Sequence, residues 1–278
     1  MLFELAKYYA AMPEAQRWRL PESPEQIKNQ QPMKLLVCVS KTPETTAKLA
    51  FTNNNAEFDS SGVQYIMNPY DEWYALVRAL ELKEALGGSV TIINVGPAAN
   101  ETIIRKGLAI GADEAVRIDA EPHSALYVAQ QIAEYAKGEQ FDIVFLGKES
   151  IDYNGSEVGP MVAELLGLPF ISHATKLEME GNKALIEADI DGGDAQLEVE
   201  TPFVISAAKG LAEQRIPNMR GIMMAKRKPL NVVAPETKEN LSVAVRFTLP
   251  PEKGDVKLID PEHMEELVRL LHEEAKVI

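Results

Sequence analysis

"FDIVFLG" at residues 141–147 is followed by "KESIDYNGSE" at 148–157 and by "VGPMVAELLG" at 158–167. The first part is an apolar run of the kind that forms a strand buried on both faces. The last part predicts a helix that starts near Ser156. The small and polar residues between them outnumber what a plain turn needs, which indicates that this loop does more than join a strand to a helix.

The same alternation extends outward toward the N-terminus. Strands that alternate with helices pair in parallel through crossover connections, so the pattern predicts an α/β fold with a mostly parallel sheet. Further strands are predicted at 34–40, 89–96 and 114–119, and helices at 67–84, 99–110 and 122–137.

The helix at 67–84 carries the clearest start signal. Asn68 is a residue type that favours the N-cap, and Pro69 suits the first helical position. Asp71 and Glu72 put negative charge in the first turn, where the helix dipole favours it. We therefore expect Asn68 to cap this helix.

The pattern changes after Pro169. Residues 174–202 predict two or three antiparallel strands with turns at "EGNK" and "DGGD". Residues 203–208 predict a buried strand that returns to the main sheet. A closing helix is predicted at 261–278.

The chain is expected to have three parts. Residues 1–32 are an N-terminal extension or a misassigned start, and 33–228 form the α/β domain. Residues 229–278 form an extended arm with little periodicity. An extended arm with apolar residues must pack either on its own domain or on a partner subunit.

The net charge of the chain is -14. Such an acidic chain is a poor partner for nucleic acid or an anionic membrane, because both attract positive charge. No apolar stretch approaches the ~20 residues that a membrane helix needs, so no membrane insertion is expected.

Cys38 is the single cysteine of the chain. No disulfide can form within the chain, and a reducing, cytoplasmic location is expected. Its place in the apolar run "LLVCVS" predicts a buried, inert thiol. The four histidines are scattered without ligand spacing, and no nucleophile stands beside a base, so we expect no metal site and no catalytic residue.

Two interpretations of the loop at 147–159 stay open. Gly155 and Gly159 allow close backbone approach, and the N–H groups of the helix start can bind an anion such as a phosphate. Alternatively, Asn154 and Glu157 form an ordinary capping pair in a simple turn. No Gly-x-Gly-x-x-Gly and no Gly-x-x-x-x-Gly-Lys-Ser/Thr sequence is present, which argues against a standard dinucleotide fold and an NTPase phosphate loop.

Residues 209–230, "KGLAEQRIPNMRGIMMAKRKPL", combine a basic cluster with exposed-type apolar residues. A charge run of this kind is usually a solvated turn. Methionine-rich surface segments also adapt to protein partners, which is the second interpretation. The apolar residues concerned are Met219, Ile222, Met223 and Met224.

Several segments together resemble the beta subunit of electron transfer flavoprotein, and the resemblance covers nearly everything from Met33 to the C-terminus. No single motif is decisive, but seven in the same order are specific. They are "VCVSKTPE" (37–44), "MNPYDE" (67–72), "NVGPAANETIIRKGLAIGADEAVRI" (94–118), "GKESID" (147–152), "GPMVAELLGLP" (159–169), "DGGDAQLEVETPFVIS" (191–206) and "IMMAKRKPL" (222–230).

The resemblance implies an adenine nucleotide alpha-hydrolase-like sheet, a small antiparallel hairpin insertion and a C-terminal arm that holds a larger alpha subunit. The alpha subunit of this family carries the redox-active FAD, and the beta subunit buries AMP. In flavin-bifurcating members a second FAD takes the place of AMP. The heterodimer carries electrons from dehydrogenases, notably the acyl-CoA dehydrogenases of fatty acid beta-oxidation, to a quinone-linked oxidoreductase. The beta subunit is expected to be an electron-carrier subunit and not an enzyme in its own right.

The family's functional residues match positions of this chain. Met219 falls where the family presents an apolar anchor to the dehydrogenase. Glu157 stands where the family typically has glutamine, and Ser40 and Lys41 replace the usual Lys-Arg. The residues that match the AMP contacts are Cys38, Asn68, Pro69, Tyr70, Asp71, Val95 and the loop from Gly147 to Val158, which includes Ser150, Tyr153, Asn154, Gly155, Ser156 and Glu157.

A second class of function competes with this one. Universal stress proteins share this sheet, bind ATP and act as stand-alone regulators. They usually have a Gly-x-x-Gly then Gly-Ser/Thr phosphate loop, which is missing here, and they lack a long C-terminal arm.

Overall fold

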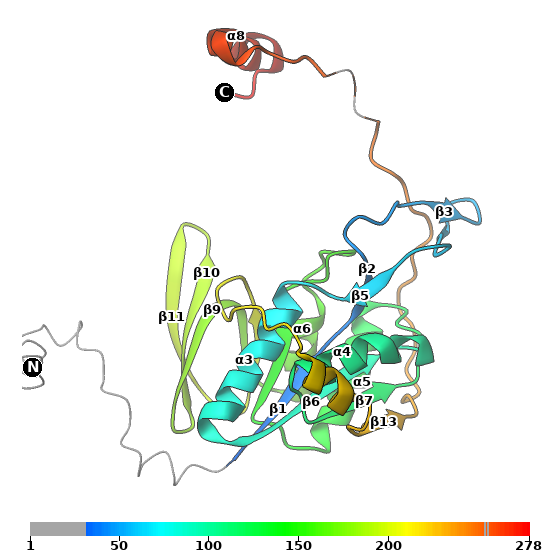
Figure 1. The fold of residues 1–278 in the computed structure, drawn as a ribbon, viewed down its shortest axis with the longest axis vertical. Helices are drawn as coiled ribbons and strands as arrows, with labels where there is room; N and C mark the ends of the chain where they lie inside the picture. The colour runs from blue at the N-terminus through cyan, green and yellow to red at the C-terminus, as the bar shows by residue number, and fades with distance from the viewer. Residues whose placement is uncertain (1–31, 253, 255) are drawn as a thin grey trace, which may run out of the picture. The chain divides into compact units, whose positions relative to one another are not determined.

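One nine-stranded sheet organises the computed structural model, which describes residues 32–252, 254 and 256–278 (Figure 1). Its order is β11-β10-β9-β12-β8-β1-β6-β7-β13, and all neighbours from β9 to β13 are parallel. The predicted α/β class is therefore confirmed. The strands are β1 (Met33–Cys38), β6 (Gly88–Val95), β7 (Glu114–Ile118), β8 (Ile143–Gly147), β9 (Phe170–Glu180), β10 (Lys183–Ile190), β11 (Gly193–Glu200), β12 (Phe203–Ala207) and β13 (Leu230–Val233).

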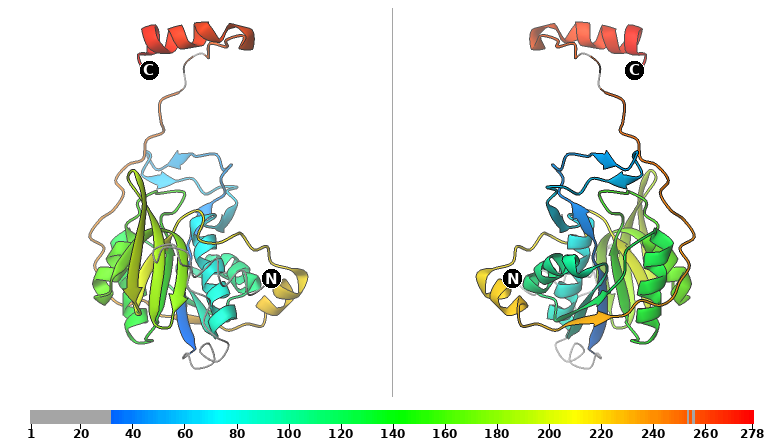
Figure 2. Two further views of the ribbon diagram at one scale, coloured as in Figure 1. Left: turned by 90° about the vertical axis from the view of Figure 1, so that its left-hand side faces the viewer. Right: turned by 90° about the vertical axis from the view of Figure 1, so that its right-hand side faces the viewer.

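Helices cover both faces of this sheet (Figure 2). Alternate residues of β1 point to opposite faces because the side-chain period of a strand is two. Leu35 and Val37 pack with the core that contains α3 and α4, whereas Leu36 and Cys38 pack with the core that contains α5 and α6. The helices are α3 (Asp71–Leu86), α4 (Glu101–Ile110, preceded by the 3-10 turn Ala98–Asn100), α5 (Ala125–Lys137), α6 (Val158–Leu166) and α7 (Met219–Ala225).

The antiparallel end of the sheet follows the sequence pattern. Strands β9, β10 and β11 form two successive hairpins, and their turns contain Gly181 and Gly192 at positive φ, 64° and 87°. Glycine adopts this conformation without steric cost. Strand β12 then returns between β9 and β8, parallel to both, as predicted for 203–208.

The sheet extends into the segment that the sequence assigned to the arm. Strand β13 pairs in parallel with β7, with Leu230 opposite Ala115. The sequence pattern also missed a short antiparallel pair, β2 (Lys41–Pro43) with β5 (Tyr65–Met67). Both features are too short to show a periodicity.

The described chain divides into two compact units. The first comprises the described residues up to Lys48 together with Ser60–Val243, and so contains the whole sheet. The second comprises Leu49–Asp59 and Ala244–Ile278. Residues 1–31 of the predicted N-terminal extension lie outside the described residues.

A small aromatic cluster holds the second unit together. The hairpin of β3 (Phe51–Thr52) and β4 (Glu57–Phe58) places Phe51 against Phe247, with parallel rings 5.0 Å apart. The Phe247 N–H donates to the Asn55 carbonyl at 2.7 Å. The predicted closing helix is present as α8 (Met264–Leu270), flanked by Pro261–His263 and Leu271–Ala275. Within the described ranges, no helix is long and apolar enough to cross a membrane.

Substitution of Gly147 tests how closely α3 approaches β8. A Cβ atom at Gly147 would lie 2.9 Å from the backbone nitrogen of Glu72, so Gly147→Ala must push the helix start away from the strand. We expect a loss of about 1–3 kcal/mol in the free energy of unfolding, measured by urea titration. Gly155→Ala is the matched control, because its Cβ would meet its nearest atom at an ordinary 3.5 Å. Equal stability of the two variants would contradict the close approach.

Candidate nucleotide-binding site

Three neighbouring strands end at the same edge of the sheet. Cys38, Val95 and Gly147 are the last residues of β1, β6 and β8, which are adjacent and parallel. The chain leaves β1 toward β6 and β7, and later returns to place β8 on the other side of β1. The predicted residues therefore meet at a switch point, where open α/β sheets bind their ligands.

Asn68 joins two of the loops that leave this edge. It is fully buried, and its N–H donates to the Ser40 carbonyl at 3.0 Å. Its side-chain Nδ2 donates to the Glu149 carbonyl at 3.0 Å, and its Oδ1 accepts from the Ile151 N–H at 3.1 Å. The side chain thus spans from the β5 exit to the β8 exit and supports both loops.

The prediction that Asn68 caps the helix is wrong. Helix α3 begins at Asp71, and its N-cap residue is Tyr70, whose side chain forms no capping hydrogen bond. Pro69 accordingly lies outside the helix. The amide of Asn68 bonds to distant backbone groups that no local pattern reveals, and these long-range partners replace the local cap.

Glu72 is the principal polar residue that the sequence analysis misjudged. The sequence analysis placed its charge in the first turn of the helix, which is correct, but did not foresee that the side chain is buried. Its Oε2 accepts from the Ser40 N–H at 2.7 Å, and its Oε1 accepts from the Ser40 hydroxyl at 2.6 Å. Burial raises the pKa of the Glu72 carboxyl to about 8, although the Ser40 and Asn68 hydrogen bonds act in the opposite direction.

Cys38 lies beside this carboxyl group. It is a buried free thiol, as predicted. Burial, and secondarily the charge of Glu72, raises the pKa of the Cys38 thiol. The thiolate is the reactive form of cysteine, so this residue is suited to packing and not to chemistry.

The loop after β8 has an unusual backbone. Asn154 and Ser156 have φ of 49° and 52°, and Tyr70, across the edge, has φ of 63°. Such left-handed conformations are costly for residues other than glycine, and they gather at functional sites. Residues 152–157 are all exposed.

The simple capped turn proposed for this loop is wrong in its details. Helix α6 begins at Val158 with Glu157 as its N-cap residue, and no side chain caps its first turn. Asn154 and Glu157 therefore form no capping pair. The carboxyl of Glu157 instead folds back over Gly155, with its Cδ 3.5 Å from where a Cβ of Gly155 would lie.

A cavity of about 240 Å³ opens between the start of α3 and the loop after β8. Two lysines, Lys148 and Lys209, give it positive groups, and the sequence analysis did not single out Lys209. Burial raises the pKa of Asp71, while nearby Lys148 opposes that shift. The lining residues are Pro69, Tyr70, Asp71, Tyr74, Lys148, Glu149, Ile151 and Lys209.

The structure brings together only part of the predicted set. Pro69, Tyr70 and Asp71 line the cavity, and Asn68 and Gly147 support its walls. Cys38 and Val95 lie under the edge at the strand ends. Ser150 is half-buried in the loop, as is Val158 at the start of α6, whereas Tyr153, Asn154, Gly155 and Ser156 are exposed and do not line this cavity.

The 209–230 segment contains helix α7, which is not one of the elements that form the switch-point edge. Asn218 caps α7 by accepting from the Gly221 N–H at 2.8 Å. Met219 is 74% exposed, and Ile216, which the sequence analysis did not single out, is 84% exposed. Among the residues that the structure describes, no group of three or more histidine, cysteine or acidic side chains is arranged to hold a metal ion.

Glu72 is expected to give stability a distinctive pH dependence. Its pKa is about 8 in the folded chain, against an ordinary value of 4.5, so the folded state retains a proton that the unfolded state has lost between these pH values. The stability contributed by Glu72 is full below pH 4.5 and is lost as pH rises through about 8, by up to about 1.4 kcal/mol per pH unit.

Urea unfolding of the wild type and of Glu72→Gln, from pH 5 to pH 9, measures this effect. The difference between the two free energies of unfolding should fall across pH 5–8 and then level off. Groups present in both proteins cancel from the difference. A difference that does not change with pH would show that Glu72 is ionised in the folded state.

Comparisons with known proteins support one family. Residues 56–238 match the family model described as the electron transfer flavoprotein domain. The chain is 37% identical over 261 residues to the electron transfer flavoprotein subunit beta of Bacillus subtilis. The aligned region covers 88% of this chain and 100% of that protein. It is 32% identical over 256 residues to the human subunit beta, covering 88% of this chain and 99% of that protein. The chain therefore belongs to the electron transfer flavoprotein beta-subunit family.

Proposed function

We propose that this chain is the beta subunit of a heterodimeric electron transfer flavoprotein. The observation that supports it best is the match, over 88% of this chain, to proteins named subunit beta, whose name implies an alpha partner. The heterodimer would relay electrons from dehydrogenases, such as acyl-CoA dehydrogenases, to a quinone-linked oxidoreductase. The role of the chain is to hold its partner and its donor, and it makes or breaks no bond of its own.

The switch-point edge is proposed to bind AMP. An uncapped start of α6 offers backbone N–H groups to a phosphate. Lys148 and Lys209 line the cavity at the start of α3, together with Asp71 and Glu149. Asn68 and Gly147 keep the two loops at a fixed separation. These features support a ligand that carries a phosphate, for which we propose AMP, with a second FAD in the same place as the alternative.

The redox chemistry is proposed to come from FAD held mainly by the alpha subunit. The residues of this chain position the partner and exclude water near it. Exposed apolar residues of the arm support such a partner, since Val245 is 81% exposed and Leu258 is 89% exposed. Met219 is proposed to dock the dehydrogenase.

Release of bound nucleotides tests the proposal. The chain is expressed together with its alpha subunit, the complex is denatured, and the released nucleotides are identified by mass. One FAD and one AMP per heterodimer is the expected result. Two FAD and no AMP per heterodimer would indicate that FAD occupies the proposed AMP site, as in flavin-bifurcating members. A monomer that releases only ATP would overturn the proposal in favour of a stand-alone regulator.

Glu157→Gln should tighten the binding of AMP. Glu157 is the N-cap residue of α6 and its carboxylate folds back over Gly155, from where it would repel a phosphate bound at the helix start. Removing its charge should lower the Kd of the heterodimer for AMP about threefold to tenfold, measured by calorimetry after AMP is stripped. Glu164→Gln, exposed on the same helix, is the charge-matched control. An equal Kd for both variants would place the phosphate elsewhere.

A further inference from the structure

The 209–230 segment exposes flexible apolar side chains on a backbone that is firmly held. Ile216, Met219 and Met223 are 84%, 74% and 68% exposed. Arg220, Lys226 and Arg227 are exposed around them, in a chain whose net charge is -14. This surface suits a partner with an apolar pocket and an acidic rim.

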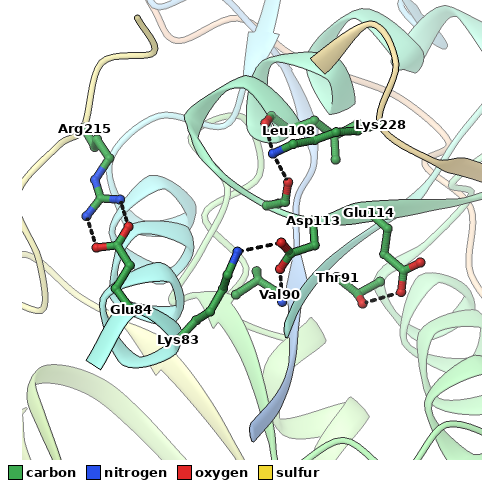
Figure 3. Close-up of polar contacts among 10 residues, drawn as sticks. Lys83, Glu84, Val90, Thr91, Leu108, Asp113, Glu114, Arg215 and Lys228 are labelled. Carbon is green, nitrogen blue, oxygen red and sulfur yellow. Dashed lines mark hydrogen bonds and ion pairs between the residues drawn. The ribbon is translucent and has the colours of Figure 1, made fainter. Parts of the chain in front are cut away.

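The first anchor lies directly before Ile216. Arg215 forms a two-pronged pair with Glu84 of α3, with nitrogen–oxygen distances of 2.6 and 3.0 Å (Figure 3). The indole Nε1 of Trp73, also on α3, donates to the Arg215 carbonyl at 3.2 Å. Both the side chain and the main chain of Arg215 are therefore fixed to the same helix.

The second anchor is a reciprocal exchange between α4 and α7. Arg105 of α4 donates to the carbonyls of Ala225 and Lys228, at 2.8 and 2.7 Å, and so satisfies the end of α7. Lys228 in turn donates to the carbonyls of Leu108 and Ala112, at the end of α4 (Figure 3). Cations at a helix C-terminus bond its last carbonyls and match its dipole.

The two helices also touch through a glycine. A Cβ atom at Gly221 would lie 2.4 Å from the Ala109 carbonyl oxygen, so only glycine allows α7 this close to α4. The backbone from Arg215 to Lys228 is thus held at its beginning, its middle and its end.

We propose that Glu84 and Arg105 are positioning residues that hold this backbone in the conformation that binds the donor dehydrogenase. The proposal rests on the proposed function, because it assumes that the 209–230 segment docks the donor. A backbone fixed in advance leaves only side chains to be ordered on binding, which lowers the entropic cost of association. The methionine side chains remain free to adapt to the pocket.

Glu84→Ala tests the proposal, because Glu84 is largely exposed and its loss leaves the core intact. Glu81→Ala is the matched control. It removes the same charge from the same helix, but Glu81 forms its ion pair with Arg78 and acts on Arg215 only through its charge, without a hydrogen bond. Glu84→Gln keeps an acceptor oxygen for Arg215 and should behave as an intermediate.

Two measurements are made on the heterodimer of each variant. Hydrogen exchange of residues 210–218 should rise in Glu84→Ala only. The KM for an acyl-CoA dehydrogenase, reduced by its acyl-CoA substrate, should rise about fivefold in the same variant, with kcat and Tm nearly unchanged. Arg105→Met should raise the same KM and increase exchange at 219–225.

The outcomes separate this inference from the proposed function. Exchange in Glu84→Ala equal to that in Glu81→Ala would overturn the anchoring. Faster exchange with an unchanged KM would show that the anchoring has no role in binding the donor, and would overturn the proposal. A wild-type heterodimer that no dehydrogenase reduces would overturn the proposed donor role. In that event, the exchange data alone would still show whether Glu84 holds the segment.

Discussion

The hydrogen bonds between Glu72 and Ser40 are the interaction on which the loops at the ends of β1, β6 and β8 depend. A carboxyl group buried at the first turn of α3 holds the chain that leaves β1 by both its N–H and its hydroxyl. Burying an acid is costly unless its oxygens are hydrogen-bonded or it stays protonated, and Glu72 uses both routes. The start of α3 is thereby fixed over the end of β8, where only glycine fits at position 147. Asn68 extends the same support to the next loop.

Most of the sheet could be predicted from the sequence, because its signal is local. Buried parallel strands appear in the sequence as continuous apolar runs. The hairpins of β9 to β11 are indicated by alternating apolar and polar residues and by glycine in the turns. Strand β13 and the β2–β5 pair carry no such signal, since each spans only three or four residues. Their pairing is decided by neighbours far away in the sequence.

The site was predictable in its position but not in its contacts. Strand ends identify the edge, and Cys38, Val95 and Gly147 were assigned to it through the resemblance to the family. The roles of Asn68 and Glu72 could not, because an asparagine or an acid near a helix start looks the same whether it caps the helix or reaches a distant loop. The partners of the Asn68 side chain lie 81 and 83 positions away. Lys209 belongs to the cavity only because β12 returns beside β8.

Strand β11 forms one outer edge of the sheet and has a bearing on solubility during assembly. An uncovered edge strand can pair with another copy of itself and start aggregation. Here the edge carries Asp194, Glu198 and Glu200, within a strand whose residues are mostly exposed. Two such edges brought together would confront like charges, which is unfavourable. The acidic side chains of β11 therefore disfavour pairing between the sheets of two copies of this chain.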